Sequence, residues 1–242
     1  MTAPRLLLIS SSTVHGSGYL DHCAGEIRDL LGGSVRRVLF VPFALADRDG
    51  YAAKARERFA AMGYGVDALH QAADAPAAVA AAEAVFVGGG NTFRLLSALW
   101  ALGVVEPLRR RVGDGMPYLG ASAGTNVACP TIRTTNDMPI VEPPTFEALG
   151  LVGFQINPHY LDPDPSSTHR GETREQRLVE YLEENERPVV GLREGAMLRV
   201  EGAAVELRGT AAARLFRRGG PPEEHGPGSR LEGLLPPPAV FG

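Results

Sequence analysis

Short apolar runs alternate with helix-like segments through the first two-thirds of the chain, and this alternation limits the folds open to it. Apolar runs at Arg5–Ser10, Arg37–Phe43 and Val66–His70 predict strands, and Tyr19–Leu31 and Tyr51–Met62 predict the helices between them. Strands that are apolar along their whole length are typical of parallel sheets with both faces covered. We therefore expect an α/β fold with a mainly parallel sheet and helices on both faces.

The same alternation continues to the middle of the chain. Ala84–Val87 and Pro117–Gly120 predict two further strands, and Asn91–Leu102 and Val104–Val112 predict the helices between them. Such βαβα repetition leaves the carboxyl ends of the parallel strands at one edge, where open α/β sheets hold their functional sites. We therefore look for chemistry in the loops that follow strands.

The last third of the chain has a different pattern. Strands are expected at Phe154–Asn157 and Pro188–Leu192, flanking a helix that begins near Thr173 with the spacing of a capping box. Three short segments with glycines at their turns predict a C-terminal β-meander, at Ala196–Glu201, Ala204–Arg208 and Ala212–Arg217. We expect a single α/β domain over residues 1–218 and an irregular tail rich in Gly and Pro over residues 219–242.

Composition argues against several classes of partner. The 242 residues carry a formal net charge of −4, whereas nucleic-acid binding depends on clustered Lys and Arg, so we expect no nucleic acid. The two cysteines, Cys23 and Cys129, form neither a disulfide framework nor a zinc spacing, which predicts no metal and a cytoplasmic location. No apolar stretch approaches the roughly 20 residues of a membrane helix, so we expect no membrane.

The segment Gly120-Ala121-Ser122-Ala123-Gly124 carries a candidate nucleophile. A sharp turn from strand to helix lifts a serine hydroxyl above the sheet, and small neighbours are needed because the backbone is crowded there. The N–H groups at the start of the following helix can stabilise an oxyanion, and Ala123 is the natural donor. The alternative is a plain strand–loop–helix junction, in which Gly and Ser are common.

A second glycine cluster, Gly88-Gly89-Gly90-Asn91, also follows a predicted strand and precedes a predicted helix. It lacks the spacing of a dinucleotide-binding loop and the Lys of a P-loop, so a phosphate site is the weaker interpretation. We interpret Gly89 and Gly90 as further backbone donors of an oxyanion hole. Glycines that simply permit a tight turn are the structural alternative.

A serine nucleophile needs a base, usually His, and the His needs a carboxylate to orient it. Among six histidines, only His159 directly follows a predicted strand, where Pro158 stiffens the loop. Two carboxylates compete for the third role: Asp137 lies in a polar loop, and Glu194 follows an apolar strand. The residues leave both open, because triads occur in several chain orders. The carboxylate that does not hold the His could bind the ammonium of a peptide N-terminus.

Four segments resemble the peptidase E family of bacterial α-aspartyl dipeptidases. The similarity runs from about Leu6 to Gly195 and is strongest in Gly88–Phe93, Ala128–Val141, Gln155–His159 and Gly171–Arg177. Ala121 stands where that family has Trp, and one extra residue lies between His159 and Gly171.

The resemblance implies a fold akin to the class I glutamine amidotransferases, which is flavodoxin-like, with Ser in place of their Cys. It implies hydrolysis of small peptides with an N-terminal Asp, with Ser122 as the nucleophile and His159 as the general base. The positions that match the family's acid are Asp137 and Glu194. No metal or organic cofactor is implied, and we expect a monomer or a homodimer.

Selection of Asp over Asn requires a cation, and Arg is suited to it because its guanidinium forms two parallel hydrogen bonds with a carboxylate. Arg174 and Arg133 are the candidates, and Arg174 is preferred because it begins the helix near the loop that carries His159. Asn91 is a third candidate for substrate contact. The segment Tyr160–Arg170 is predicted to be a lid.

Three other functions compete with this interpretation. One is a cyanophycinase-like or other serine peptidase that acts on β-aspartyl or polymeric substrates. Another is a catalytically silent protein that holds a small anion in its glycine-rich loops. Glutamine amidotransferase activity is disfavoured, because neither Cys23 nor Cys129 occupies the position of Ser122.

Overall fold

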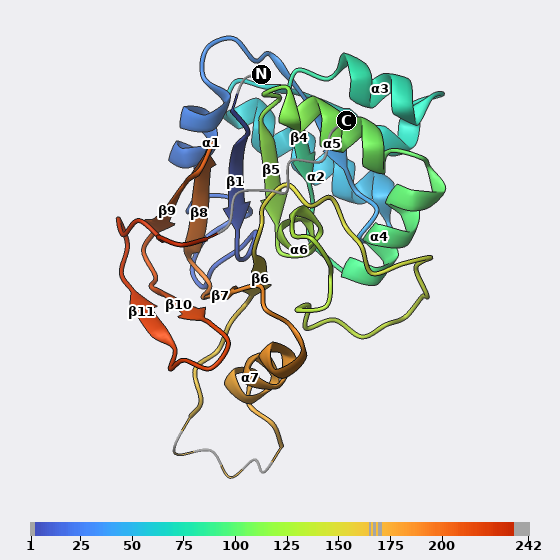
Figure 1. The fold of residues 1–242 in the computed structure, drawn as a ribbon. Coiled ribbons are helices and arrows are strands. Elements are labelled where there is room, and N and C mark those ends of the chain that lie inside the picture. Colours follow the sequence, from blue (N-terminus) through green and yellow to red (C-terminus); the bar gives the residue numbers. More distant parts are fainter. Residues whose placement is uncertain (1–2, 165, 167, 169–170, 235–242) are drawn as a thin grey trace.

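The computed structural model describes residues 3–164, 166, 168 and 171–234, which form two sheets with helices around them (Figure 1). The larger sheet contains β1 (Arg5–Ile9), β2 (Arg37–Val41), β3 (Gly65–Ala68), β4 (Val85–Val87), β5 (Tyr118–Ala121), β8 (Ala196–Glu201) and β9 (Ala204–Gly209). Its strand order is β3-β2-β4-β5-β1-β8-β9. All pairings from β3 to β1 are parallel, and β8 and β9 extend the sheet with antiparallel pairings.

A flavodoxin-like sheet has the strand order 2-1-3-4-5. In this chain β2 corresponds to its first strand, so β3-β2-β4-β5 matches 2-1-3-4, and β1 takes the place of strand 5. Strands β1, β2, β4 and β5 therefore end at the same edge. Their apolar side chains are buried on both faces, as the continuous apolar runs predict.

Helices cover both faces of the larger sheet. On one face, α1 (Ala24–Leu31) and α2 (Arg48–Ala61) bury Ile27, Leu30, Ala55 and Phe59 against the sheet. On the other lie α3 (Ala75–Ala81), α4 (Thr92–Ala101), α5 (Val105–Gly113) and α6 (Ala123–Ala128). A 3-10 turn over Leu69–Gln71 follows β3. The predicted α/β fold with a mainly parallel sheet and helices on both faces is confirmed.

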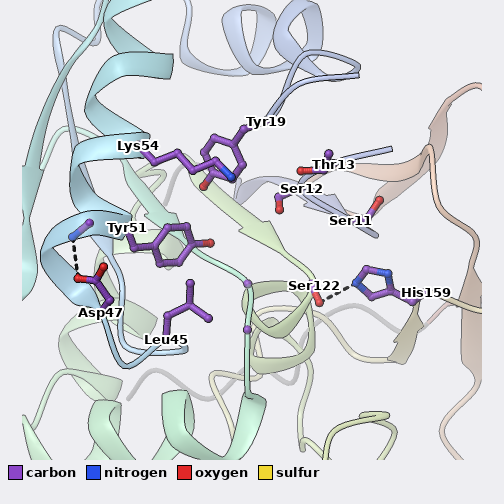
Figure 2. A pocket seen from close by; sticks show the side chains of 13 residues that line it. Ser11, Ser12, Thr13, Tyr19, Leu45, Asp47, Tyr51, Lys54, Ser122 and His159 are labelled. Atoms are coloured by element: carbon purple, nitrogen blue, oxygen red, sulfur yellow. Dashed lines mark hydrogen bonds between the residues drawn. The ribbon is translucent and has the colours of Figure 1, made fainter. Parts of the chain in front are cut away.

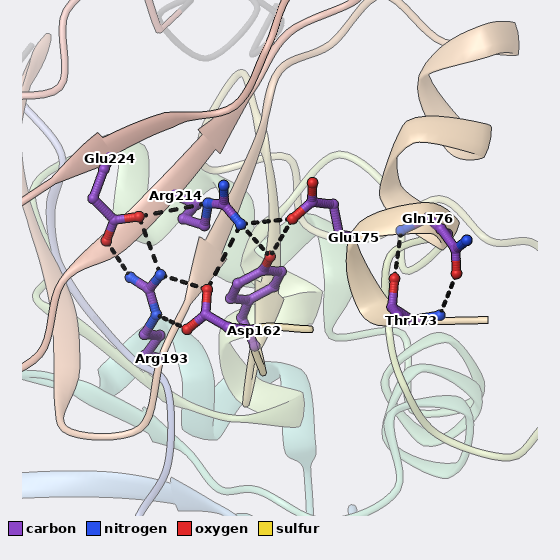
Figure 3. Close-up of polar contacts among 8 residues, drawn as sticks. Asp162, Thr173, Glu175, Gln176, Arg193, Arg214 and Glu224 are labelled. Atoms are coloured by element: carbon purple, nitrogen blue, oxygen red, sulfur yellow. Dashed lines mark hydrogen bonds and ion pairs between the residues drawn. The ribbon is translucent and has the colours of Figure 1, made fainter. Parts of the chain in front are cut away.

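A second, smaller sheet stands beside the first (Figure 1). It has the order β11-β10-β7-β6 and contains β6 (Gln155–Pro158), β7 (Val189–Leu192), β10 (Ala213–Phe216) and β11 (Glu223–His225). Strands β6 and β7 are parallel, and the other two pairings are antiparallel. Helix α7 (Arg174–Glu184) packs Leu178 and Leu182 against Val189 and Phe216. Thr173 and Gln176 form the predicted capping box at its start (Figure 3).

Several predictions about the chain's elements need correction. The predicted β-meander forms only as the hairpin β8–β9, because β10 pairs with β7 in the second sheet, where Leu215 and Phe216 are buried. The tail, predicted to be irregular, contributes strand β11. Helix α1 begins at Ala24 rather than Tyr19, and helix α3 was not predicted because its Ala-rich sequence buries only Val79.

Two further observations concern predictions about the chain as a whole. Part of the segment Tyr160–Arg170, predicted to be a lid, lies outside the described residues, as do residues 235–242 of the tail. Among the residues that the structure describes, no helix is long and apolar enough to cross a membrane.

Candidate active site

Ser122 lies in the sharp turn between β5 and α6. Its φ of 52° is in the left-handed region that non-glycine residues rarely adopt. The turn needs glycine at both ends. A Cβ on Gly120 would lie 2.5 Å from the Gly124 carbonyl oxygen, and one on Gly124 would collide with the Val87 carbonyl oxygen. The Ser122 N–H donates to the Ile9 carbonyl at 3.0 Å, which ties the turn to β1. This is the strained elbow that presents a serine hydroxyl above a sheet.

His159 follows β6 and also has a positive φ, 53°. Its backbone N–H donates to Ser10 Oγ at 2.9 Å, and that hydroxyl donates to the Leu192 carbonyl at 2.7 Å. This chain of hydrogen bonds fixes the His159 backbone to the ends of β1 and β7. The imidazole then lies with Nε2 at 2.9 Å from Ser122 Oγ (Figure 2).

Glu194 lies on the other side of the imidazole, with Oε1 at 2.7 Å from His159 Nδ1. It follows β7, the strand parallel to the one that ends before His159, so both side chains leave the same edge of the second sheet. A carboxylate in this place favours the tautomer with the proton on Nδ1, which leaves Nε2 free to accept the Ser122 proton.

Asp137, the competing carboxylate, lies elsewhere. Its Oδ2 accepts the Thr92 N–H at 2.7 Å and the Thr92 hydroxyl at 2.5 Å, and Thr135 Oγ1 lies 3.2 Å away. No hydrogen bond or ion pair joins Asp137 to His159 within the described part of the chain. The carboxylate therefore sits at the start of α4, where the helix dipole favours a negative charge. Asn91 caps this helix through the Arg94 N–H at 3.0 Å, and its amide donates to the Met138 carbonyl at 2.8 Å.

The predicted oxyanion donors Gly89 and Gly90 line the same cavity as Ser122, and Ala123 follows it in the chain. A Cβ on Gly89 would lie 3.1 Å from Ser122 Cβ, so this loop touches the serine directly. Burial raises the pKa of Tyr51. A hydrogen bond from the Gly89 N–H to the Tyr51 hydroxyl partly offsets this rise. In the described structure, neither the Gly90 N–H nor the Ala123 N–H has an acceptor. These two groups are the donors free to meet a substrate oxygen.

A cavity of about 550 Å³ opens beside the Ser122–His159 pair (Figure 2). Besides Gly89 and Gly90, its lining includes residues of the loop after β1, of the loop between β2 and α2, and of α2 itself. Arg133 and Arg174 do not line it. They face a separate cavity of about 130 Å³ together with Asn136, Asn157 and Arg177.

The cavity lined by Arg133 and Arg174, called here the arginine cavity, lies next to the His159 loop. No Asp or Glu is found among its described lining residues. Asn136 Nδ2 donates to the Pro158 carbonyl at 2.8 Å, which connects its wall to the residue before His159. Burial and the charge of Arg177 lower the pKa of the Arg174 guanidinium, and Asp137 opposes this only in part. Arg174 Nε is buried and has no hydrogen-bond partner in the described chain. A partly buried cation whose Nε has no partner is a favourable site for an anion.

Residues 6–208 match the sequence profile of Peptidase family S51. The chain belongs to this family. It is 59% identical to "Peptidase E" of Streptomyces coelicolor over 96% of this chain and 95% of that one. It is 50% identical to the "Probable alpha-aspartyl dipeptidase" of Drosophila melanogaster over 97% and 98% of the two chains.

The predicted relationship to the peptidase E family is thus confirmed, and solved structures agree on the fold. The crystal structure of a peptidase from an acI-B1 Actinobacterium superposes with a TM-score of 0.71 over 95% of this chain and 97% of that one, at 17% identity. In this S51 chain, no group of three or more His, Cys, Asp or Glu side chains is arranged to hold a metal, as far as the described residues go.

An ion-pair network beside the site was not predicted from the sequence (Figure 3). Arg193, the residue before Glu194, donates from Nε and Nη2 to the two carboxylate oxygens of Asp162, both at 2.7 Å, and from Nη1 to Glu224 at 2.5 Å. Arg214 continues the network to Glu175 on α7 at 2.6 Å. The network therefore joins the segments after β6 and β7 to β11. Isolated charges in a sequence give no sign of such pairing, because the partners are 31 or more residues apart.

Proposed function

We propose that this protein is a serine-type dipeptidase that hydrolyses dipeptides with an N-terminal aspartate through an acyl-enzyme on Ser122. The observation that carries the proposal is the chain of contacts Ser122 Oγ–His159 Nε2 at 2.9 Å and His159 Nδ1–Glu194 Oε1 at 2.7 Å. Membership of Peptidase family S51, and the names of the two relatives above, support the choice of a peptidase.

The reaction proceeds by acyl transfer. His159 accepts the Ser122 proton as Oγ attacks the carbonyl carbon of the aspartyl residue, and it then passes that proton to the leaving amine as the C–N bond breaks. Water next attacks the aspartyl ester, with His159 again taking and returning a proton. The Gly90 and Ala123 N–H groups, with Gly89 completing the loop, stabilise the oxyanion. Loss of one such donor typically costs about 3–4 kcal/mol of transition-state stabilisation.

Glu194 is the residue that orients His159 in this mechanism. Asp137 keeps a different role that suits its place at the start of α4. Thr92 and Thr135 contact its Oδ2, and no described residue forms a hydrogen bond with Oδ1, so we assign Oδ1 to the α-ammonium of the substrate. Asn91 caps the same helix and presents its side chain beside that position.

Selectivity for aspartate is assigned to the arginine cavity. Arg174 is the primary residue because its guanidinium is partly buried without a partner, and Arg133 lines the same space from the other wall. A β-carboxylate there neutralises Arg174, whereas the amide of Asn leaves the buried charge unpaired. Arg133 also lies over the Phe146 ring, at 5.3 Å from its centre, which limits the movement of that guanidinium.

The deciding experiment is steady-state hydrolysis of the p-nitroanilides of Asp, Asn, Glu and Leu by the wild type and by Ser122→Ala. Strong preference for Asp that disappears in Ser122→Ala supports both the reaction and the nucleophile. Parallel assays with α- and β-linked Asp-Leu separate the proposal from a β-aspartyl or cyanophycinase-like peptidase. If no substrate is cleaved and Ser122 does not react with sulfonyl fluorides, the anion-binding alternative is favoured.

A further inference from the structure

Lys54 is the only lysine in the chain, among 24 Lys and Arg residues. It projects from α2 into the 550 Å³ cavity that Ser122 and His159 line, on the opposite side from the Ser–His pair (Figure 2). Among the described residues that line the cavity there is no other Lys and no Arg.

The ammonium of Lys54 is held in place without a counter-ion. Its Nζ lies 4.5 Å from the centre of the Tyr19 ring, Tyr19 contacts Tyr51 at 6.2 Å, and Tyr51 contacts the buried Phe40 at 4.9 Å. Through these ring contacts, Tyr19 and Tyr51 connect Lys54 to the hydrophobic core. None of the ion pairs found among the described residues includes Lys54, whereas Arg58 on the same helix pairs with Asp21 at 2.9 Å.

Hydroxyl groups from the loop after β1 add donors to the lining of this cavity. Ser11, Ser12 and Thr13 all line the cavity. Ser11 is 2% exposed, and its Oγ has no hydrogen-bond partner in the part of the chain that the structure describes. An ammonium without a counter-ion that lines a cavity is a favourable place for an anionic ligand group. A carboxylate is such a group, because it is anionic and accepts several hydrogen bonds.

We propose that Lys54 binds the C-terminal carboxylate of the dipeptide, so that this cavity holds the leaving residue. This inference rests on the proposed function, which places the aspartyl side chain in the arginine cavity and leaves the larger cavity for the second residue. The aromatic rings of Tyr19 and Tyr51 provide an apolar wall for that residue's side chain. Recognition of a free carboxylate one residue beyond the scissile bond restricts cleavage to dipeptides.

The test compares Asp-Leu with Asp-Leu amide, two substrates that differ only in the terminal carboxylate. The wild type is expected to prefer Asp-Leu. Lys54→Met should lower kcat/KM for Asp-Leu about 10- to 100-fold, mainly through KM, because a hydrogen bond to a charged group is lost. Its activity on Asp-Leu amide should stay within about threefold, and Lys54→Arg should restore part of the Asp-Leu activity. Arg56→Met, which removes one positive charge from the same helix outside the cavity, is the matched control.

Because Lys54 is the only lysine, a direct binding measurement is available. Reductive ¹³C-methylation of Ser122→Ala gives NMR signals from Lys54 and the chain's α-amine alone. Titration with Asp-Leu should shift the Lys54 signal, and titration with Asp-Leu amide should leave it unchanged.

Two results would overturn the inference. Equal losses on both substrates in Lys54→Met would place Lys54 on the aspartyl half, and no loss on either would remove it from substrate binding. If the wild type cleaves neither substrate, the proposed function fails, and this outcome is distinct from a failure of the inference about Lys54. In that case the NMR titration still decides whether Lys54 recognises the carboxylate.

Discussion

Replacement of Glu194 by Gln tests which carboxylate orients the imidazole. Gln has nearly the same shape and keeps an oxygen that can accept the His159 Nδ1 proton, so the loop after β7 should be preserved. What the change removes is the charge in a 2.7 Å contact. A hydrogen bond to a charged group contributes about 1.5–3 kcal/mol. The Glu194 and His159 side chains are 51% and 36% exposed, so solvent screening places this contact in the lower part of that range.

A loss of about 1.5–2 kcal/mol from the transition state corresponds to a fall in kcat of about 10- to 30-fold. KM for Asp-p-nitroanilide should change little, because Glu194 touches the base rather than the substrate. The matched variant is Asp137→Asn, which should keep kcat within about threefold and raise KM if Asp137 binds the substrate ammonium. The reverse ranking, with kcat normal in Glu194→Gln and strongly reduced in Asp137→Asn, would refute the assignment.

Four further outcomes follow from the contacts described. Arg174→Lys should lower kcat/KM for Asp substrates by at least tenfold while activity on Leu-p-nitroanilide is unaffected, since Lys cannot make two parallel hydrogen bonds; wild-type kinetics would contradict the assignment. Arg193→Met should lower the free energy of unfolding in urea by about 1–2 kcal/mol at pH 7, and the difference between wild type and variant should be smaller below about pH 4. The difference becomes smaller because Arg193 holds the pKa of Asp162 low, so this stabilisation is lost as the carboxylate is protonated. A difference in unfolding free energy that does not depend on pH would argue against this ion pair as its source. Burial raises the pKa of Cys23 and of Cys129 to about 12, so neither thiol should react with Ellman's reagent at pH 8 before unfolding. Gly120→Ala should destabilise the protein by about 1–3 kcal/mol in the same urea assay, because its Cβ would lie 2.5 Å from a backbone oxygen; unchanged unfolding would show that the elbow can relax.

The sequence predicts the larger sheet well because its strands carry a strong local signal. Leu6–Ile9 and Val38–Val41 are continuously apolar, and each is buried along its whole length. The second sheet was harder to foresee. Its strand β11, Glu223–His225, is polar and partly exposed, so no hydrophobic pattern marks it, and only pairing with β10 defines it.

The same contrast applies to the candidate site. Ser122 could be found because the turn that holds it demands small neighbours in a fixed order. The choice between Asp137 and Glu194 could not be made from sequence, because both follow plausible loops and the answer depends on how the two sheets meet. The position of Lys54 depends on ring contacts between α2 and the loop before α1, which sequence spacing does not report.

The candidate site lies where the two sheets meet, so its residues come from distant parts of the chain. Ser122 is placed by the larger sheet, whereas His159 and Glu194 come from the ends of β6 and β7 in the smaller one. Alignment within hydrogen-bond distance therefore depends on the junction between the sheets. Ser10 contributes to this junction, since its hydroxyl accepts from the His159 backbone and donates to the Leu192 carbonyl while its own backbone continues β1. The Ser10 hydroxyl thus joins the sheet that carries the nucleophile to the sheet that carries the base. The sequence Leu8-Ile9-Ser10, which marks only the end of a strand, gives no hint of this role.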